Sequence, residues 1–250
     1  MQLNRVKDKL AVVTGGASGI GKAIAAELAR QGAHVFVGDI NDKPGLDAAR
    51  EISNFGRCEF ARLDVTDDDS IAELKERIQE VKPCPDILVN AAGWDVIEPF
   101  WKNTPEYWDK VIALNLMGPI KLTRAFIEEM IEVRSGKIVN IGSDAGRVGS
   151  LGESVYAGSK GGIIAFTKSI AREVARYNIN VNCVCPGPTD TPLFASQPDK
   201  NKEALIRAIP FRRLGKPSDI AQAVVYFASD ESDYVTGQVL SVSGGLTMVD

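Results

Sequence analysis

A tyrosine and a lysine stand four residues apart in the segment ESVYAGSKGG, residues 153–162. At this spacing on a helix, Tyr156 and Lys160 share one face. A phenol with a pKa of about 10 is a poor base at neutral pH, and bringing that pKa to about 7 requires about 4 kcal/mol. Two unit charges about 4 Å apart interact by about this amount at an effective dielectric constant of about 20. The lysine ammonium is therefore predicted to lower the pKa of the tyrosine and make it a general base.

Such a pair would take the proton of an alcohol while a hydride leaves the carbinol carbon for a cofactor. Ser143, at the end of an expected strand, can hold the same oxygen with its hydroxyl. The alternative interpretation is structural, with the ring half in the core and the lysine stem lying along it. The chemical interpretation is favoured because Ala157, Gly158 and Ser159 leave room for a cofactor.

A glycine-rich turn, TGGASGIG at residues 14–21, follows an expected strand and opens an expected helix. Its spacing departs from G-x-G-x-x-G, but Gly15, Gly19 and Gly21 remove Cβ atoms where a backbone must approach a pyrophosphate. The helix N-terminus would offer its free N–H groups to the phosphates. Asp39 ends the next strand and can accept hydrogen bonds from both ribose hydroxyls, while its charge would repel a 2′-phosphate. The pattern predicts NAD rather than NADP.

Short β-branched runs alternate with longer segments of helical period along the chain. Strands are expected at residues 10–14, 34–38, 58–63, 86–92, 137–143, 179–187 and 238–245, and long helices at about 106–134 and 154–177. This alternation is typical of βαβ units, and apolar strands are typical of a sheet that is covered on both sides. The prediction is an α/β fold, a single doubly wound Rossmann-type domain over residues 1–250 with a mostly or wholly parallel seven-stranded sheet and helices on both faces.

The composition limits the partners of the chain. It has 250 residues, a net charge of −4 and no apolar stretch long enough to cross a bilayer. A cytoplasmic protein that binds small molecules, rather than nucleic acid or a membrane, is expected. Four cysteines without CxxC spacing and a single histidine argue against a metal site. Cys183 and Cys185 would face the same side of a strand and fill core space.

Three further motifs extend the pattern, namely NAAG at residues 90–93, NLMG at 115–118 and PGPTDTP at 186–192. In this order, and together with the residues described above, they resemble the classical short-chain dehydrogenases/reductases over essentially the whole chain. The resemblance implies an NAD-dependent alcohol dehydrogenase with a catalytic set of Asn115, Ser143, Tyr156 and Lys160. Asn115 would help to hold a water that links Lys160 to solvent.

Further residues are expected to hold the cofactor. Asp64 and Val65, after the third strand, could serve the adenine through a carboxylate and a backbone N–H. By the resemblance, residues 90–93 would pass under the cofactor and residues 186–192 would cover the nicotinamide. Ala91 departs from the family, which more often has a second asparagine there. The expected cofactor residues are Gly15, Ser18, Gly19, Ile20, Gly21, Asp39, Ile40, Asp64, Val65, Asn90, Ala91, Gly93, Tyr156, Lys160, Pro186, Gly187, Thr189 and Thr191.

Four segments carry a narrower resemblance, to the 2-hydroxycyclohexanecarboxyl-CoA dehydrogenases of aromatic and alicyclic acid degradation. They are AGWD at residues 92–95, 143–162, CVCPGPTDTPL at 183–193 and GQVLSVSGGLTM at 237–248. This resemblance implies oxidation of a cyclic β-hydroxyacyl-CoA with NAD and Tyr156 as the general base. The expected substrate residues are Trp94, Ser143, Arg147, Tyr156 and Leu193. For Arg147, a ligand and an interface residue remain equal interpretations.

The segment 194–216 has six basic residues against two acidic ones, a balance of +4 in an acidic chain. A substrate lid at about 190–215 with this charge would favour a phosphate-bearing substrate such as a CoA thioester. A solvated helix explains the charges equally well.

Other functions stay open. The same mechanism could serve a free cyclic alcohol, a polyol or a sugar, or a 3-oxoacyl reductase, and a non-catalytic NAD-binding regulator is the alternative from a different class. Long helices and an apolar C-terminal segment favour a homotetramer. The resemblance implies the same, because members of the family commonly pair through these helices and the last strand.

Overall fold

A computed structural model describes residues 4–195 and 199–249, and it leaves the side chains of residues 199–202 undescribed. Within these residues one parallel sheet has the strand order β3-β2-β1-β4-β5-β6-β7. The strands are β1 (Leu10–Thr14), β2 (His34–Asp39), β3 (Cys58–Arg62), β4 (Ile87–Asn90), β5 (Gly136–Ile141), β6 (Ile179–Pro186) and β7 (Val239–Val242). The order reverses between β1 and β4, as in a doubly wound sheet, so the predicted α/β fold is confirmed.

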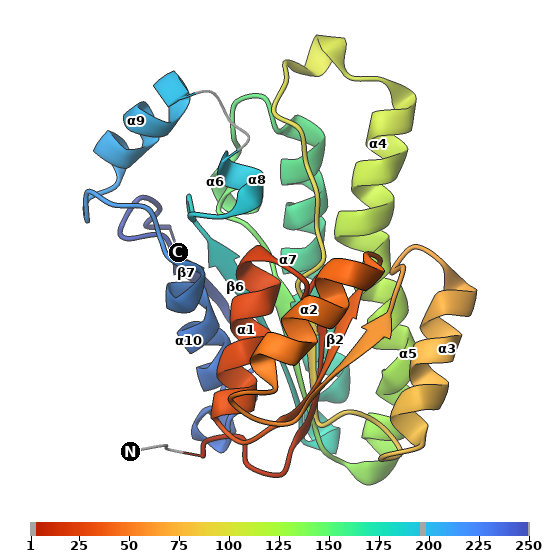
Figure 1. The fold of residues 1–250 in the computed structure, drawn as a ribbon. Helices are drawn as coiled ribbons and strands as arrows, with labels where there is room; N and C mark the ends of the chain where they lie inside the picture. Colours follow the sequence, from red (N-terminus) through yellow and green to blue (C-terminus); the bar gives the residue numbers. More distant parts are fainter. Residues whose placement is uncertain (1–3, 196–198, 250) are drawn as a thin grey trace.

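Helices cover both faces of this sheet (Figure 1). They are α1 (Gly19–Arg30), α2 (Asp42–Ile52), α3 (Asp68–Gln79), α4 (Pro105–Ile112), α5 (Gly118–Val133), α6 (Ala145–Val148), α7 (Ser154–Val174), α8 (Pro192–Ala195), α9 (Asp199–Ala208) and α10 (Pro217–Ala228). α1, α2 and α10 pack on one face through buried residues such as Ile24 and Val224. α3, α5 and α7 pack on the other face, with Leu74 and Phe126 at its centre.

Strand β1 shows why the strands read as unbroken apolar runs. Ala11 and Val13 face the core under α1 and α10, whereas Leu10 and Val12 face the core under α3 and α5. All four are at most 3% exposed. Because neither face of the strand meets water, a polar residue at alternate positions would have no solvent partner.

The segment predicted as one helix over residues 106–134 is helical from residue 105 to 133, but its α-helical hydrogen-bond ladder is interrupted once. A π-helical turn, Ala113–Met117, separates α4 from α5. Pro119 has no N–H and cannot bond to the carbonyl of Asn115, so the regular ladder is interrupted there. Asn115 is fully buried in this turn, a location at which π-helical turns often serve a site. The helix predicted over 154–177 ends as α7 at Val174 and continues as a short 3₁₀ turn.

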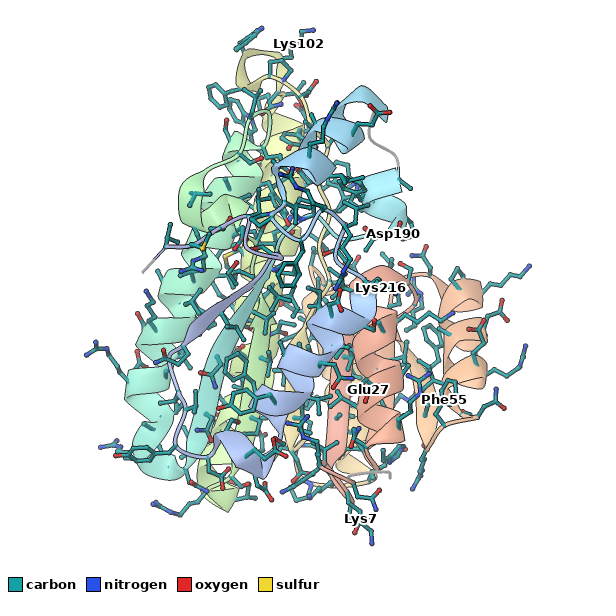
Figure 2. The ribbon with its side chains drawn as sticks, turned by 90° about the vertical axis from the view of Figure 1, so that its left-hand side faces the viewer. Lys7, Glu27, Phe55, Lys102, Asp190 and Lys216 are labelled. Carbon is teal, nitrogen blue, oxygen red and sulfur yellow. The ribbon has the colours of Figure 1, made fainter. Side chains whose placement is uncertain are left out.

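The carboxyl ends of the strands all lie at one edge, and α8 and α9 lie beyond that edge (Figure 1). Figure 2 shows Lys102 at this end of the molecule and Lys7 at the opposite end. Cys183 and Cys185 pack together on β6 with their Sγ atoms 3.8 Å apart, and both are buried, as expected of a core pair. None of the helices within the described residues is long and apolar enough to cross a membrane.

Candidate active site

In the turn between β1 and α1, backbone atoms occupy the space that side chains of the glycines would need. Gly15 has a φ of +65°, and a Cβ there would lie 2.8 Å from the Cα of Ala92. A Cβ on Gly21 would lie 2.2 Å from the carbonyl oxygen of Gly15. The turn therefore packs against the segment after β4, and neither position tolerates a side chain. Gly19 also has a positive φ and faces Thr191, whose Cγ2 would lie 3.6 Å from an added Cβ.

The first turn of α1 has the features of an anion site. Ser18 is its N-cap, but the serine side chain makes no capping hydrogen bond. The N–H groups of the first turn therefore receive no cap from it, which suits a phosphate. Ile20 packs its side chain against the adjoining core. This edge fits a dinucleotide: residues 14–21 would hold its pyrophosphate, and the carboxylate of the next strand would hold its ribose.

Asp39 is the last residue of β2, and its carboxylate is held in place. Its Oδ2 accepts a hydrogen bond from the N–H of Ala17 (3.1 Å), and its Oδ1 accepts two from Asn41 (3.0 Å each). Ile40 follows and is half exposed. The carboxylate thus lies against the glycine-rich turn, where a ribose bound beside the phosphates would meet it.

Asp64 and Val65 follow β3 and differ in burial. The Oδ1 of Asp64 accepts hydrogen bonds from the N–H and the hydroxyl of Thr66, at 2.9 and 2.7 Å. Val65 is buried, and a Cβ on Gly118 would lie 2.7 Å from its Cγ2. The pair lies where β3 leaves the sheet, one strand beyond Asp39.

The end of β4 rests on a network that the sequence analysis missed. The Thr14 hydroxyl accepts hydrogen bonds from the N–H groups of Ala91 (3.0 Å) and Ala92 (2.9 Å). Buried Asn90 donates to Asn140 Oδ1 at 2.8 Å, while its own Oδ1 has no partner among the described residues. Because the backbone of Ala91 is held by Thr14, the missing second asparagine removes no contact from this turn. A strand-end threonine before a glycine turn is too common a pattern to have been singled out.

Asn115 links this segment to the catalytic residues. Its Nδ2 donates to the carbonyls of Trp94 (2.8 Å) and Val111 (3.0 Å), and its Oδ1 accepts from the N–H of Trp94 (3.3 Å). A Cβ on Gly93 would lie 2.8 Å from Asn115 Oδ1 and 3.5 Å from Lys160 Nζ. The chain at Gly93 therefore passes directly over both side chains.

Ser143, Tyr156 and Lys160 come together from β5 and α7. The Ser143 hydroxyl is within hydrogen-bonding range of the Tyr156 phenol, and it also accepts the N–H of Ala145 at 3.1 Å. Lys160 is buried, with its Nζ 5.6 Å from the centre of the Tyr156 ring. The Nζ donates to the carbonyl of Ile141 at 2.9 Å.

Burial raises the pKa of Tyr156, the hydrogen bond with Ser143 opposes that rise, and the charges of Glu153 and Asp95 add to it. The ammonium by itself therefore does not bring this pKa close to 7. Burial removes the hydration of a tyrosinate, and the same burial lowers the pKa of Lys160 to about 8. Within the described residues the cation alone does not offset this cost.

Residues after β6 form the opposite wall. The N–H of Gly187, next to Pro186, donates to Val242 at 3.1 Å, and the Thr189 hydroxyl donates to Gly187 at 2.8 Å. The Thr191 hydroxyl donates to the Thr189 carbonyl at 3.3 Å. This wall faces the glycine-rich turn through Thr191 and so closes the edge above the strands.

The expected substrate residues divide into two groups. Trp94 lies beside the catalytic residues through Asn115, with Tyr107 and Lys110 packed on its ring. Leu193, in α8, is 46% exposed. Arg147 instead holds the C-terminal segment, because its Nη2 donates to the carbonyl of Val249 at 2.6 Å. Lys200 and Lys202 lie outside the residues whose side chains are described.

Comparison with known proteins identifies the family. The family described as enoyl-(acyl carrier protein) reductase matches residues 15–247, nearly the whole chain. The chain belongs to the short-chain dehydrogenase/reductase family. It is therefore an oxidoreductase that acts on a CH–OH group with NAD(P), on a small-molecule substrate.

Members of this family are similar over their full length. The 3-oxoacyl-[acyl-carrier-protein] reductase of Thermotoga maritima is 42% identical over 98% of this chain and 100% of its own. The (3R)-3-hydroxyacyl-CoA dehydrogenase of Rattus norvegicus is 37% identical over 98% of both chains. A 3-oxoacyl-[acyl-carrier protein] reductase with bound NAD, from Brucella melitensis, has a TM-score of 0.90 at 35% identity and covers 99% of this chain and 95% of its own.

Proposed function

We propose that this short-chain dehydrogenase/reductase interconverts a β-hydroxyacyl thioester and the corresponding β-oxoacyl thioester, with NAD as its cofactor. The observation that carries the proposal is the meeting of Ser143, Tyr156 and Lys160 beneath Gly93, one loop away from the Asp39 carboxylate. A bound nicotinamide supplies the hydride acceptor, or in reverse the hydride donor. All other steps fall to side chains of the chain itself.

The binding of NAD is assigned to the cofactor residues predicted above. Asp39 favours NAD because its two oxygens face the ribose position, whereas a 2′-phosphate would bring a second negative charge to the same point. Asn90, Ala91 and Gly93 carry the cofactor from below, and residues 186–191 close over it. Lys160 has a second role in this assignment, because its buried ammonium can donate to a ribose hydroxyl as well as to Ile141.

Proton transfer is assigned to Tyr156. Ser143 donates a hydrogen bond to the substrate oxygen, and the phenol exchanges a proton with that same oxygen. The raised pKa keeps Tyr156 protonated at neutral pH, and a neutral phenol is ready to donate its proton to a carbonyl oxygen. This favours ketone reduction at neutral pH. Because the pKa of Lys160 is about 8, its ammonium is lost above that pH, and activity should fall there.

Two acyl groups compete for the substrate role. A cyclic β-hydroxyacyl-CoA of the 2-hydroxycyclohexanecarboxyl-CoA type is suggested by the segments that surround Trp94 and Tyr156. A 3-oxoacyl thioester is favoured by the relatives, which are named as 3-oxoacyl-[acyl-carrier-protein] reductases and a 3-hydroxyacyl-CoA dehydrogenase. The comparisons support the second candidate better. Both share the reacting unit, a hydroxyl-bearing or carbonyl carbon β to a thioester carbonyl.

A kinetic screen tests the proposal. NADH absorbance is followed with 2-hydroxycyclohexanecarboxyl-CoA, 3-hydroxybutyryl-CoA, cyclohexanol and a polyol, and in the reverse direction with acetoacetyl-CoA. Turnover of the thioesters with NAD(H) well above that of the free alcohols is expected. Preference for a free alcohol would overturn the thioester assignment, and absence of turnover with every alcohol and ketone would leave a nucleotide-binding protein.

Two further assignments accompany this function. Residues 190–215 are proposed as the substrate lid of a domain that spans residues 1–250, since α8 and α9 lie above the catalytic edge (Figure 1). A homotetramer is proposed because the C-terminal segment leaves Met248 82% exposed and Leu240, in the edge strand β7, 40% exposed. Light scattering that gave the 26.9 kDa monomer would contradict it.

A further inference from the structure

A buried carboxylate follows the catalytic loop directly. Asp95 comes two residues after Gly93 and is 6% exposed. The Tyr107 hydroxyl donates to its Oδ1 at 2.5 Å, while its buried Oδ2 has no hydrogen-bond partner among the described residues. Burying a carboxylate oxygen without a hydrogen-bond partner lowers the stability of the fold, so the arrangement indicates a functional role.

A second carboxyl group, that of Glu153, lies near Asp95 at the start of α7. Glu153 precedes that helix and lies three residues before Tyr156. The N–H of Glu98 donates to the carbonyl of Gly152 at 3.0 Å, which holds the loop of Asp95 against the start of α7. The carboxyl groups of Asp95 and Glu153 approach within hydrogen-bonding range, and the charges of both act on the Tyr156 phenol. The charges of two acids thus act on the Tyr156 hydroxyl.

Two carboxyl groups this close act on each other through their charges. Burial raises the pKa of Asp95 to about 7, the bond from Tyr107 opposes this, and the charge of Glu153 adds to it. The other titratable groups around the pair are Tyr107 on α4, and Tyr156 and Lys160 on α7. Below about pH 7 Asp95 is protonated and neutral, and above it the negative charge of Asp95 acts on Tyr156.

We propose that Asp95 and Glu153 form one acidic site near the Tyr156 hydroxyl, which rejects β-hydroxy acids with a free carboxylate and admits the neutral ester or thioester. The inference rests on the proposed function, because it concerns the acyl group of the same substrate. The carboxylate of a β-hydroxy acid must lie close to the Tyr156 oxygen, on which the charges of both acids act. Like charges in a buried site repel strongly, whereas a thioester brings no charge.

The test uses a substrate pair that lacks CoA and its phosphates, namely 2-hydroxycyclohexanecarboxylate and its ethyl ester. The kcat/KM of each is measured with NAD for wild type, Asp95→Asn and Glu153→Gln. Wild type should prefer the ester by at least about tenfold, and each variant should lose most of this preference through a lower KM for the acid. Glu98→Gln, on the same loop but bonded to Asn103 instead, is the matched control and should keep the wild-type ratio.

The pH dependence supplies a signature that a structural role would not produce. The preference of wild type for the ester should grow between about pH 6 and about pH 8, as Asp95 loses its proton, and it should stay flat in Asp95→Asn. An unchanged ratio of ester to acid in both variants, with no pH dependence in wild type, would overturn the acidic site.

A binding experiment separates this inference from the proposed function. The NADH-loaded protein is titrated with cyclohexanecarboxylate and with its ethyl ester, without turnover. Tighter binding of the acid by at least about tenfold in Asp95→Asn and Glu153→Gln supports the acidic site even where wild type oxidises neither alcohol. Equal dissociation constants in wild type and both variants contradict it, while thioester turnover in that case would leave the proposed function standing.

Discussion

The proposed site has a nucleotide half, which includes residues 14–21 and Asp39, and a substrate half, which includes Trp94 and Asp95. The two halves are constructed differently. In the nucleotide half, backbone atoms do most of the work: Gly15 and Gly21 have no room for a Cβ, and Asp39 is bonded to the backbone of Ala17 and Asn41. In the substrate half, side chains on loops define the surface, as Trp94 and Asp95 do between β4 and α4. We therefore expect cofactor binding to depend on the shape of the backbone, and substrate choice to depend on a few replaceable side chains.

The charged residues of the two halves also differ. The basic residues of the proposed lid are partly neutralised, because Arg207 pairs with Glu203 at 3.6 Å and Arg213 with Asp219 at 2.6 Å. All four side chains are substantially exposed, so each pair is weak and open to exchange with a ligand phosphate. Asp39, by contrast, accepts hydrogen bonds from backbone N–H groups, which a ligand cannot displace as it can an exposed side chain.

Removal of the catalytic phenol should give the largest effect. Tyr156→Phe is expected to lower turnover by at least about 10²-fold, because the proton donor is gone while the ring is kept. NAD affinity, measured by titration, should be nearly unchanged. Retention of half of the wild-type rate would exclude Tyr156 as the acid–base group.

The second-largest effect is expected from a methyl group placed between the nucleotide half and the substrate half. Gly93→Ala puts a Cβ 2.8 Å from Asn115 Oδ1, so it should displace the catalytic residues and lower kcat about 30- to 100-fold. Gly158→Ala is the control, because an added Cβ on this exposed helical residue meets nothing within 4 Å. The control should raise stability by about 0.5–1 kcal/mol, measured by urea unfolding. A Gly93→Ala enzyme with wild-type kcat would show that the close passage is unimportant.

Asp39→Ala tests whether the nucleotide half alone selects the cofactor. A charge-assisted hydrogen bond contributes about 1.5–3 kcal/mol, so the preference for NAD over NADP should fall about 30-fold. The ratio of the two kcat/KM values measures it, with Asp42→Asn, an exposed neighbour paired with Arg62, as the control. A ratio that stays constant would locate cofactor choice elsewhere.

The smallest effect is expected in the lid. Replacing Lys200, Lys202 and Arg207 by glutamine should raise the KM for an acyl-CoA about tenfold, since exposed charges contribute about 0.5–1 kcal/mol each. Both kcat and the KM for NAD should stay constant, because such contacts are equal in ground and transition states. Equal KM values at low and high salt would identify α9 as a solvated helix.

The sequence by itself determined the fold and the chemistry of the nucleotide half. Strand positions follow from local β-branched runs, and the glycine turn and Asp39 are found from their place after β1 and at the end of β2. Position along the chain carries this information because parallel strands bring their carboxyl ends to one edge. The proposed catalytic pair, Tyr156 and Lys160, was predicted from a spacing that a single helix converts into proximity.

Tertiary structure decided what depends on contacts between distant segments. The π-helical turn within the helix over 106–134 depends on Pro119 and on the hydrogen bonds of Asn115 to Trp94. The pKa of Tyr156 is raised by burial, which no spacing reveals, so the charge of Lys160 alone does not predict it. The pairing of Asp95 with Glu153 joins residues 58 positions apart through a loop contact. Local pattern shows which groups a chain can offer, but only packing sets the distance and the dielectric environment that determine their charge.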